Sequence, residues 1–508
     1  MYIDDLGDLV NVSRTSRLFY YAALPRLYES VTLRLYKNLR YREDNLPEGY
    51  GGGSPFSTAL NAMATRNLAQ YVRSFHLTGQ INEPRLEDYS KGRVPDNSFI
   101  LNIAIRAAMD KMKNLETFMY VTRPLSQYNV DQFPSWDLRG KPLQTIYQGL
   151  SSCTNLQTLT LRFPDSRLPS PIVTVPPFPN LREFKALEID PLCSPDDISV
   201  MIAHSPKLEG LHLQWSARMR NAGEESINLA LYFGRCIANK RPLKLKRLST
   251  INLFARATNV DFNQLVDLED LEETTFLNSR TCDANSVFVD DTWRFFTLEK
   301  PPRGLRMMRT DAVDDHPPAG LDRLYFVSNG SGPSPARGRD PTPPSSPNPP
   351  AALLSRLGPS LRHLLLPDHW LLDVETVGRL ARACPRLEQL GMAVGDVAGC
   401  LRVLGTRLPE MWALRFLRYT LKSEFEECWE DNEDIDTFLR MDDGWGNLRW
   451  LGMGDTVFRC RMSRHGGSMK NQVETERDVK SVRRILEKVN VAAVRDVEIW
   501  KMDNGEIV

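Results

Sequence analysis

The residues from Cys384 to Met392, Cys-Pro-Arg-Leu-Glu-Gln-Leu-Gly-Met, decide the fold of this chain. Leu387 is followed by two residues, an apolar residue, one more residue and a second apolar residue, and these last positions alternate as a strand with one buried face requires. The proline ahead of Leu387 ends the helix before it. That helix is predicted to begin after Asp373, an N-cap residue, with Val377 and Leu380 on its apolar face. Helix, proline turn and strand form one unit.

The same phrase recurs along most of the chain, which indicates an internal repeat. Its copies are Val72-Phe75-Leu77, Leu115-Phe118-Tyr120, Leu156-Leu159-Leu161, Leu208-Leu211-Leu213, Leu248-Ile251-Leu253, Leu321-Leu324-Phe326, Leu361-Leu364-Leu366, Leu387-Leu390-Met392, Leu414-Leu417-Tyr419, Leu448-Leu451-Met453 and Val494-Val497-Ile499. Weaker copies begin at Leu181, Leu271 and Leu305.

Two further helices are predicted from the spacing of apolar residues. The first opens at Ser98 and carries Ile103, Ala107 and Met112 on one face. The second precedes the copy at Val494 and uses Val479, Val482, Ile485, Leu486 and Val489.

The spacing resembles that of leucine-rich repeats, whose units of about 20–29 residues carry an L-x-x-L-x-L phrase. Leu156 and Leu181 begin copies 25 residues apart, and Leu208 follows 27 residues later. The resemblance implies an α/β solenoid with a curved row of parallel strands and helices on the convex side. We expect it over residues 71–508, interrupted by a proline-rich, disordered insertion at 329–352, after a connector and first helix at 37–70.

Residues 1–36 resemble the second half of an F-box, as found in fungal F-box proteins with leucine-rich repeats. The F-box pattern D-L-x-x-L-S-x-x-S-R-x-F is followed by residues 8–19, Asp8-Leu9-Val10-Asn11-Val12-Ser13-Arg14-Thr15-Ser16-Arg17-Leu18-Phe19. A second helix ending at Pro25 then leads into an extended segment. The usual opening L-P-x-E helix is not in this sequence. The resemblance implies binding to a Skp1-like adaptor and its cullin through Leu6, Leu9, Val10, Val12, Leu18 and Phe19. The alternative is that the segment packs on the first repeat as a cap.

Composition excludes several classes of partner. The 508 residues carry 64 basic and 64 acidic side chains, so no overall positive field favours nucleic acid or an anionic membrane. No apolar run reaches the length of a membrane span, and the N-terminus lacks the features of a signal peptide. The eight cysteines contain no C-x-x-C pair that would favour zinc. We expect a cytoplasmic or nuclear protein.

Enzyme motifs are missing from the sequence. It contains no phosphate-binding G-x-x-x-x-G-K-[ST] loop, no dinucleotide-binding G-x-G-x-x-G, no H-E-x-x-H and no G-x-S-x-G. We therefore expect no catalytic residues, cofactor or metal, and a role as the non-catalytic substrate-recognition subunit of a cullin-RING ubiquitin ligase. The alternative is a repeat scaffold that binds a partner without any ligase.

Client binding is predicted on the strand face opposite the buried leucines, where solenoids hold their ligands. The candidate residues there are His76, Arg162, His212, Gln214, Arg418 and Trp450. A second group, Trp429 with Glu426, Glu427 and Glu430, lies in an acidic stretch that would attract a basic client segment. Alternatively, both surfaces are merely solvated, and the C-terminal tryptophans close the end of the array.

Overall fold

The computed structural model describes residues 3, 5–34, 55–78, 99–121, 146–162, 176–189, 195–216, 232–253, 266–267, 269–277, 302–311, 318, 320–327, 358–368, 370–419, 445–463 and 483–503. The chain forms two compact units. Unit 1 comprises Met1–Asp270 with Cys282–Thr292, and unit 2 comprises Leu271–Thr281 with Trp293–Val508. The predicted insertion at 329–352 lies outside the described residues.

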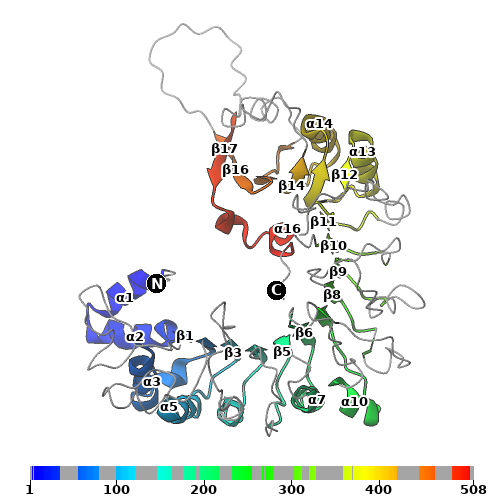
Figure 1. The fold of residues 1–508 in the computed structure, drawn as a ribbon. Helices are drawn as coiled ribbons and strands as arrows, with labels where there is room; N and C mark the ends of the chain where they lie inside the picture. Colours follow the sequence, from blue (N-terminus) through cyan, green and yellow to red (C-terminus); the bar gives the residue numbers. More distant parts are fainter. Residues whose placement is uncertain are drawn as a thin grey trace, which may run out of the picture. The chain divides into compact units, whose positions relative to one another are not determined.

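Unit 1 is a row of parallel strands in which each strand pairs with the next along the chain. The strands are β1 (Ser30–Arg34), β2 (Ser74–Thr78), β3 (Thr117–Val121), β4 (Thr158–Arg162), β5 (Glu183–Ile189), β6 (Gly210–Trp215) and β7 (Arg247–Ile251). The helices α3 (Pro55–Thr65), α5 (Phe99–Met109), α7 (Pro195–Ala203) and α10 (Gly234–Ala238) lie along one side of this row (Figure 1).

The strands of unit 1 stay in step because the same repeat position is buried in each. Phe75 pairs with Phe118, Phe118 with Leu159, and so on through Phe184 and Leu211. All of these side chains are buried. Their apolar contacts run from one repeat to the next, so a shared interior replaces the core that a single repeat is too small to build.

The N-terminal segment of unit 1 folds as two helices, α1 (Leu6–Ser13) and α2 (Arg17–Leu27). Asp5 caps α1 and Ser16 caps α2, each accepting a hydrogen bond from a backbone N–H three residues later. The predicted end at Pro25 is wrong by two residues, because α2 continues to Leu27. The chain then enters β1, which extends the strand row, and η2 (Leu68–Tyr71) precedes β2.

Unit 2 is a second row of parallel strands that ends in an antiparallel pair. Paired in chain order are β8 (Glu273–Leu277), β9 (Met307–Thr310), β10 (Arg323–Phe326), β11 (His363–Leu365), β13 (Gln389–Val394), β14 (Ala413–Tyr419) and β15 (Trp450–Met453). Beside them lie β12 (Leu371–Leu372), α13 (Val374–Ala383) and α14 (Val397–Arg407). β16 (Thr456–Ser463) and β17 (Arg483–Val489) run antiparallel, and η7 (Val491–Val494) and α16 (Glu498–Lys501) follow.

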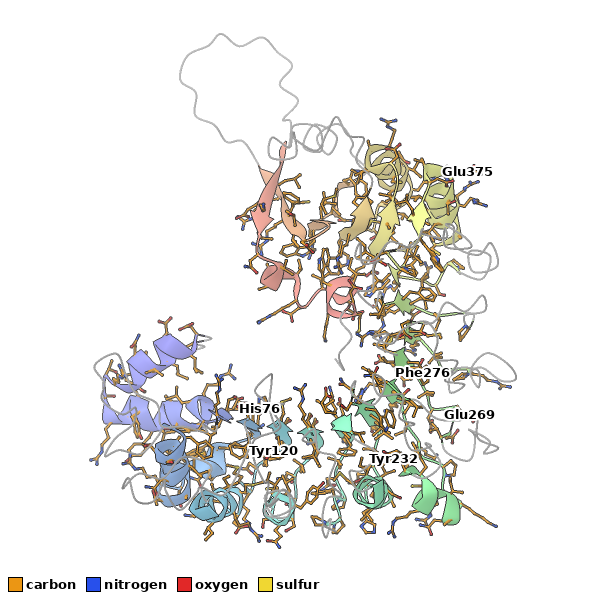
Figure 2. The ribbon with its side chains drawn as sticks, viewed as in Figure 1. His76, Tyr120, Tyr232, Glu269, Phe276 and Glu375 are labelled. Carbon is orange, nitrogen blue, oxygen red and sulfur yellow. The ribbon has the colours of Figure 1, made fainter. Side chains whose placement is uncertain are left out.

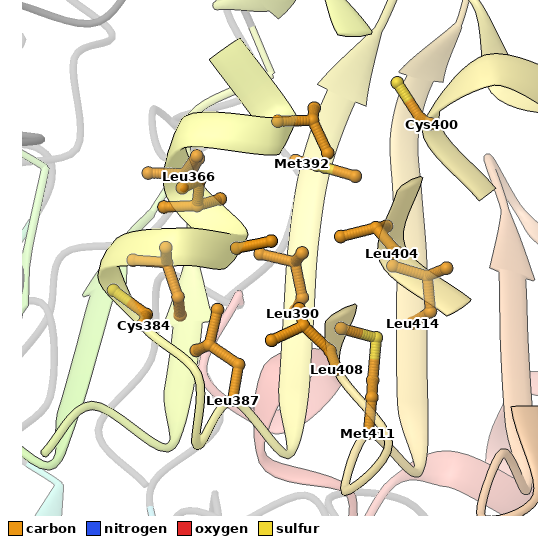
Figure 3. Close-up of a cluster of buried hydrophobic side chains, with 14 of the residues drawn as sticks. Leu366, Cys384, Leu387, Leu390, Met392, Cys400, Leu404, Leu408, Met411 and Leu414 are labelled. Carbon is orange, nitrogen blue, oxygen red and sulfur yellow. The ribbon is translucent and has the colours of Figure 1, made fainter. Parts of the chain in front are cut away.

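The predicted helix-turn-strand unit is confirmed around Asp373. Its carboxylate caps α13 by accepting a 2.7 Å hydrogen bond from the Thr376 N–H. Figure 3 shows Leu404 of α14, Leu390 of β13 and Leu414 of β14 in one apolar cluster with Leu387, which lies in the turn before β13. The leucine-rich-repeat solenoid architecture predicted from this phrase is therefore present.

Asparagines in the turns before the strands tie neighbouring repeats together. Asn114, Asn155, Asn180 and Asn447 each donate from the side-chain amide to a backbone carbonyl in the preceding repeat, over 2.8–3.2 Å. The accepting carbonyls belong to Gln70, Lys113, Thr154 and Pro409. Each of these turns is thereby linked to the one before it, in addition to the strand ladder.

The strand register places two predicted copies out of frame by three residues. Leu248 pairs with Leu211, so that copy is Leu245-Leu248-Thr250 and not Leu248-Ile251-Leu253. Leu414 pairs with Leu390, so the other is Met411-Leu414-Phe416 and not Leu414-Leu417-Tyr419. Thr250 in the first copy and Met411 in the second occupy buried positions where leucine is typical. Leu253 and Leu417, which come later, make the shifted frame fit the repeat pattern as well.

The helix predicted from Ser98 exists as α5, but its buried face differs from the prediction. Ile103 and Ala107 are exposed, whereas Ile105, Ala108 and Met109 are buried, as is Met112 beyond the helix. Apolar residues lie on more than one side of this short helix, so the sequence pattern fits two possible buried faces. Packing against the strands determines which of them is buried.

The C-terminal predictions are wrong in conformation. Ile485, Leu486 and Val489 belong to strand β17, while Val479 and Val482 lie outside the described residues. Val494 ends a 3-10 helix and Ile499 lies in α16, so no strand forms there. Val494, Val497 and Ile499 are nevertheless buried, in a cluster separate from the repeat interior. Within the described ranges, no helix is long and apolar enough to cross a membrane.

Candidate functional site

The open face of unit 1 is formed by strand positions that point away from the helices. At the centre of each strand this position lies between the two buried ones, and the register aligns these residues into a row. The row comprises Thr32, His76, Met119, Thr160, Lys185, His212 and Ser249. Most of these side chains are polar, as expected for a face that meets water or a partner.

A charged network occupies this face on β5, β6 and β7. Glu183 Oε1 lies 3.4 Å from Lys185 Nζ and 3.4 Å from His212 Nε2, and Glu183 Oε2 lies 3.3 Å from an Arg247 guanidinium nitrogen. The contact with His212, reinforced by Lys185 and Arg247, lowers the pKa of the Glu183 carboxyl to about 2. Gly210 leaves room for the side chains of Glu183 and Arg247, since a Cβ there would lie 3.3 Å from Glu183 Cγ and 3.4 Å from Arg247 Nε.

His212 is buried within this network, which corrects the expectation that it faces a client. Only 5% of the residue is exposed, and Nδ1 lies 2.9 Å from Ser249 Oγ. Burial lowers the pKa of His212, so the imidazole is neutral at neutral pH. The imidazole thus lies between Glu183 and Ser249, with Nε2 towards the first and Nδ1 towards the second.

Ser249, His212 and Glu183 occur in the order of a serine-histidine-carboxylate triad, but the site does not favour that chemistry. A nucleophilic serine must be reached by the carbonyl that it attacks. Ser249 is only 7% exposed, and Glu183 already pairs with two cations. No group of residues suited to a metal occurs in the described part of the chain.

The other predicted client residues of unit 1 are half-buried. His76 lies on β2 (Figure 2), with Nε2 3.1 Å from Ser74 Oγ, and burial lowers its pKa. Arg162 is half-buried at the end of β4. Gln214 lies 3.5 Å from Glu188 through its amide nitrogen. His76, Arg162 and Gln214 each present part of their surface on or beside the open face.

The C-terminal candidates are only partly described. Trp450 is half-buried on β15, with the Arg459 guanidinium 4.9 Å from its ring centroid. The side chain of Arg418 lies outside the described residues, as do Trp429, Glu426, Glu427 and Glu430. The predicted acidic contact with a basic client therefore stays a prediction.

The inner face of unit 2 differs from that of unit 1, because it is apolar and covered. Met307, Tyr325, Leu365 and Ala413 lie on the strands at positions that point away from α13 and α14, and all four are buried beneath the C-terminal segment. The sequence does carry a signal for this. Leu364, Leu365 and Leu366 are consecutive, and an unbroken apolar run is typical of a strand buried on both faces.

The α1–α2 hairpin leaves a set of large apolar side chains in contact with solvent. They are Leu6, Leu18, Phe19, Tyr20 and Tyr21, of which Leu18 is 77% exposed. Leu9, Val10 and Val12, the remaining predicted adaptor residues, are half-buried. Ala23 and Leu24 are buried and fix α2 to the rest of unit 1.

Comparison with known proteins gives matches among solved structures. No protein-family model matches the chain, and no curated protein matches it. One similar solved structure is the crystal structure of a TLR13–ssRNA13 complex, with 13% identity, a TM-score of 0.34, and coverage of 76% of this chain and 54% of that chain. Another is the Toll–Spatzle complex from Drosophila, with 13% identity, a TM-score of 0.30, and coverage of 89% and 52%. The chain spans about half the length of each.

Proposed function

We propose that this chain is a non-catalytic receptor that holds a client protein for a cullin-RING ubiquitin ligase. Its α1–α2 hairpin binds a Skp1-like adaptor, and its repeats bind the client. The observation that carries the proposal is the exposed apolar surface of the hairpin, in the segment whose sequence resembles an F-box. Large apolar side chains exposed on one short segment favour a protein partner, because contact with that partner removes them from water.

The hairpin is well placed to present such a surface. None of the residues of α1 is buried, so its whole length remains accessible beside α2. β1 follows the hairpin directly and pairs in parallel with β2, from Ser30 opposite Ser74 to Arg34 opposite Thr78. The hairpin is therefore joined to the first strand of the solenoid by a short connection, which limits its motion relative to the client face of unit 1.

The polar face of β1–β7 supports client binding in unit 1. The charged side chains of this face, Glu183, Lys185 and Arg247, already form ion pairs with one another. A client that binds there therefore displaces water and does not have to remove an unpaired charge from solvent. Lys185 and Arg247 flank Glu183 at the accessible edge of the network. This arrangement suits recognition of a protein surface better than bond cleavage.

The test is capture of purified Skp1 by the full-length chain. We expect Leu18→Glu and Phe19→Glu each to reduce capture at least tenfold, since a charge at a buried interface is costly. Ile103→Glu is the matched control, because Ile103 is also a large apolar residue, 61% exposed, on α5 of the same unit. It should leave capture unchanged.

The outcomes separate the two candidate functions. Capture by wild type and by Ile103→Glu, with loss in both hairpin variants, supports the receptor. No capture by the folded wild-type chain contradicts adaptor binding and favours a scaffold without a ligase, in which the half-buried Leu9, Val10 and Val12 cap the first repeat.

A further inference from the structure

The C-terminal segment 490–503 covers the face of unit 2 that points away from α13 and α14. Figure 1 shows α16 on the opposite side of the strands from these two helices. Val494, Val497, Ile499 and Met502 are buried there against side chains from the strands. The segment contributes only one turn of 3-10 helix and the four-residue α16, so its own hydrogen bonds stabilise it little and its contacts with the face hold it in place.

Three side chains from two strands, β10 and β11, surround the carboxylate of Glu498. His363 Nδ1 lies 2.8 Å from Oε2, Tyr325 donates its hydroxyl to Oε2, and an Arg323 guanidinium nitrogen lies 3.3 Å from Oε1. Burial alone raises the pKa of Glu498, but hydrogen bonds from His363 and Tyr325 and the charge of Arg323 outweigh it and lower the pKa to about 2. These three contacts therefore favour the ionised form of the Glu498 carboxyl.

Two arginines hold the far end of the segment. Arg415 lies 2.8 Å from Asp503 Oδ2 and donates to the Ile499 carbonyl over 3.3 Å. Arg309, itself buried, donates from Nε to the Met502 carbonyl over 2.9 Å. The face thus recognises a second carboxylate five residues after the first, together with the backbone between them.

The middle of the segment is held by shape and by one backbone contact. The Ile499 N–H donates to Gln389 Oε1 over 3.2 Å. Trp500 packs over Gly452, where the missing side chain leaves room for its ring, and the Arg415 guanidinium lies 5.6 Å from the ring centroid. Arg323, Tyr325 and His363 match the first carboxylate, whereas Arg415 contacts the Ile499 carbonyl, the Trp500 ring and the second carboxylate.

We propose that this face of unit 2 is a peptide-binding surface and that segment 490–503 is its resident occupant. The external partner is a protein segment of the same chemistry: an acidic residue followed by an aliphatic and an aromatic residue, in a short helical turn, with a second acidic residue five positions after the first. Charge decides this choice, because a segment without acidic residues would take Asp503 away from Arg415 and would remove Glu498, one of the two carboxylates that pair with Arg323, the other being Glu273. The proposal does not depend on adaptor binding by α1–α2.

The resident segment competes strongly because it is tethered. Only Asn490 separates β17 from η7, so the effective concentration of the segment at the face is in the millimolar range or above. A free segment gains access only when the tethered one is weakened, since its apparent affinity scales with the fraction of open molecules.

The experiment measures binding of a fluorescent synthetic peptide of residues 490–508 to the full-length chain by polarisation. We expect Glu498→Gln in the chain to bind the wild-type peptide at least tenfold more tightly than the wild-type chain does, because the resident segment has lost its ionised carboxylate. Asp496→Asn is the matched control, since the Asp496 side chain is 93% exposed and contacts only Arg495 among the ion pairs of the described residues. It should bind like wild type. A peptide carrying Glu498→Gln should bind the Glu498→Gln chain at least tenfold more weakly than the wild-type peptide.

Two results would overturn the proposal. One is a folded Glu498→Gln chain, with a wild-type circular dichroism spectrum, that binds the peptide no better than wild type does. The other is loss of folding in Glu498→Gln, which would show that the segment is an integral part of the core and not an exchangeable occupant.

Discussion

Trp500 lies directly against the backbone of Gly452. A Cβ on residue 452 would approach Trp500 Cζ2 to 2.7 Å and Arg415 Cγ to 3.0 Å, which is closer than non-bonded carbon atoms pack. Because residue 452 of β15 has no side chain, the C-terminal segment can lie on the sheet at this point.

Gly452→Ala should destabilise unit 2 because the added methyl group overpacks this contact. We expect a loss of about 1–3 kcal/mol in the free energy of unfolding, measured by chemical denaturation. Gly446→Ala is the control, since a Cβ there meets no atom within 4 Å. Equal stability of the two variants would contradict the close packing of Trp500 on the sheet.

The Glu498 carboxylate should make the stability of unit 2 depend on acid. Its pKa is about 2 in the folded chain and 4.5 ordinarily, so its contribution is fully present above about pH 4.5 and is lost as the pH falls towards 2. The shift corresponds to at most about 3 kcal/mol. Calorimetric melting across this range should show a shallower acid dependence for Glu498→Gln than for wild type. Asp496→Asn should follow wild type, and a Glu498→Gln profile that does the same would contradict the role of this carboxylate.

The asparagine contacts between turns should contribute measurably to the stability of unit 1. Asn180 donates to the Thr154 carbonyl over 2.8 Å and accepts from Lys207 over 2.7 Å. Asn180→Ala removes both hydrogen bonds, and we expect a loss of about 1 kcal/mol in the free energy of unfolding.

Asn61→Ala provides the comparison for this prediction. Asn61 is exposed on α3, so its replacement should change stability by no more than about 0.5 kcal/mol. The inter-repeat role of Asn180 would be contradicted if its replacement were equally neutral.

The repeat could be predicted because the buried positions of each unit are marked by apolar residues at a fixed local spacing. The Leu387 copy matches the structure residue by residue, and so does the copy at Leu156. The frame failed at Leu248 and Leu414, where Thr250 and Met411 occupy buried positions. Only pairing with the neighbouring strand distinguishes such a position from a leucine three residues away.

The candidate site was less predictable than the fold, because exposure depends on neighbours from other repeats. His212 lies at a position that normally points outward, yet Glu183 and Ser249 from the strands on either side enclose it. Exposure of Leu18 on the hairpin likewise follows from how α2 packs, and the sequence only assigned it to a helix.

The sequence alone determined that this chain is a repeat solenoid, because an apolar residue at each anchor position is enough to specify a helix-turn-strand unit that must stack. It also predicted the two short helices of the N-terminal segment, which the structure contains as α1 and α2. Only the tertiary structure decided what the two strand faces do. Val497 and Ile499 are apolar in any conformation, so their side chains alone do not show where they are buried. They cover the inner face of unit 2 because that face is apolar and its arginines bind the C-terminal segment. Long-range packing selects among local conformations of similar free energy, and a local pattern does not record that selection.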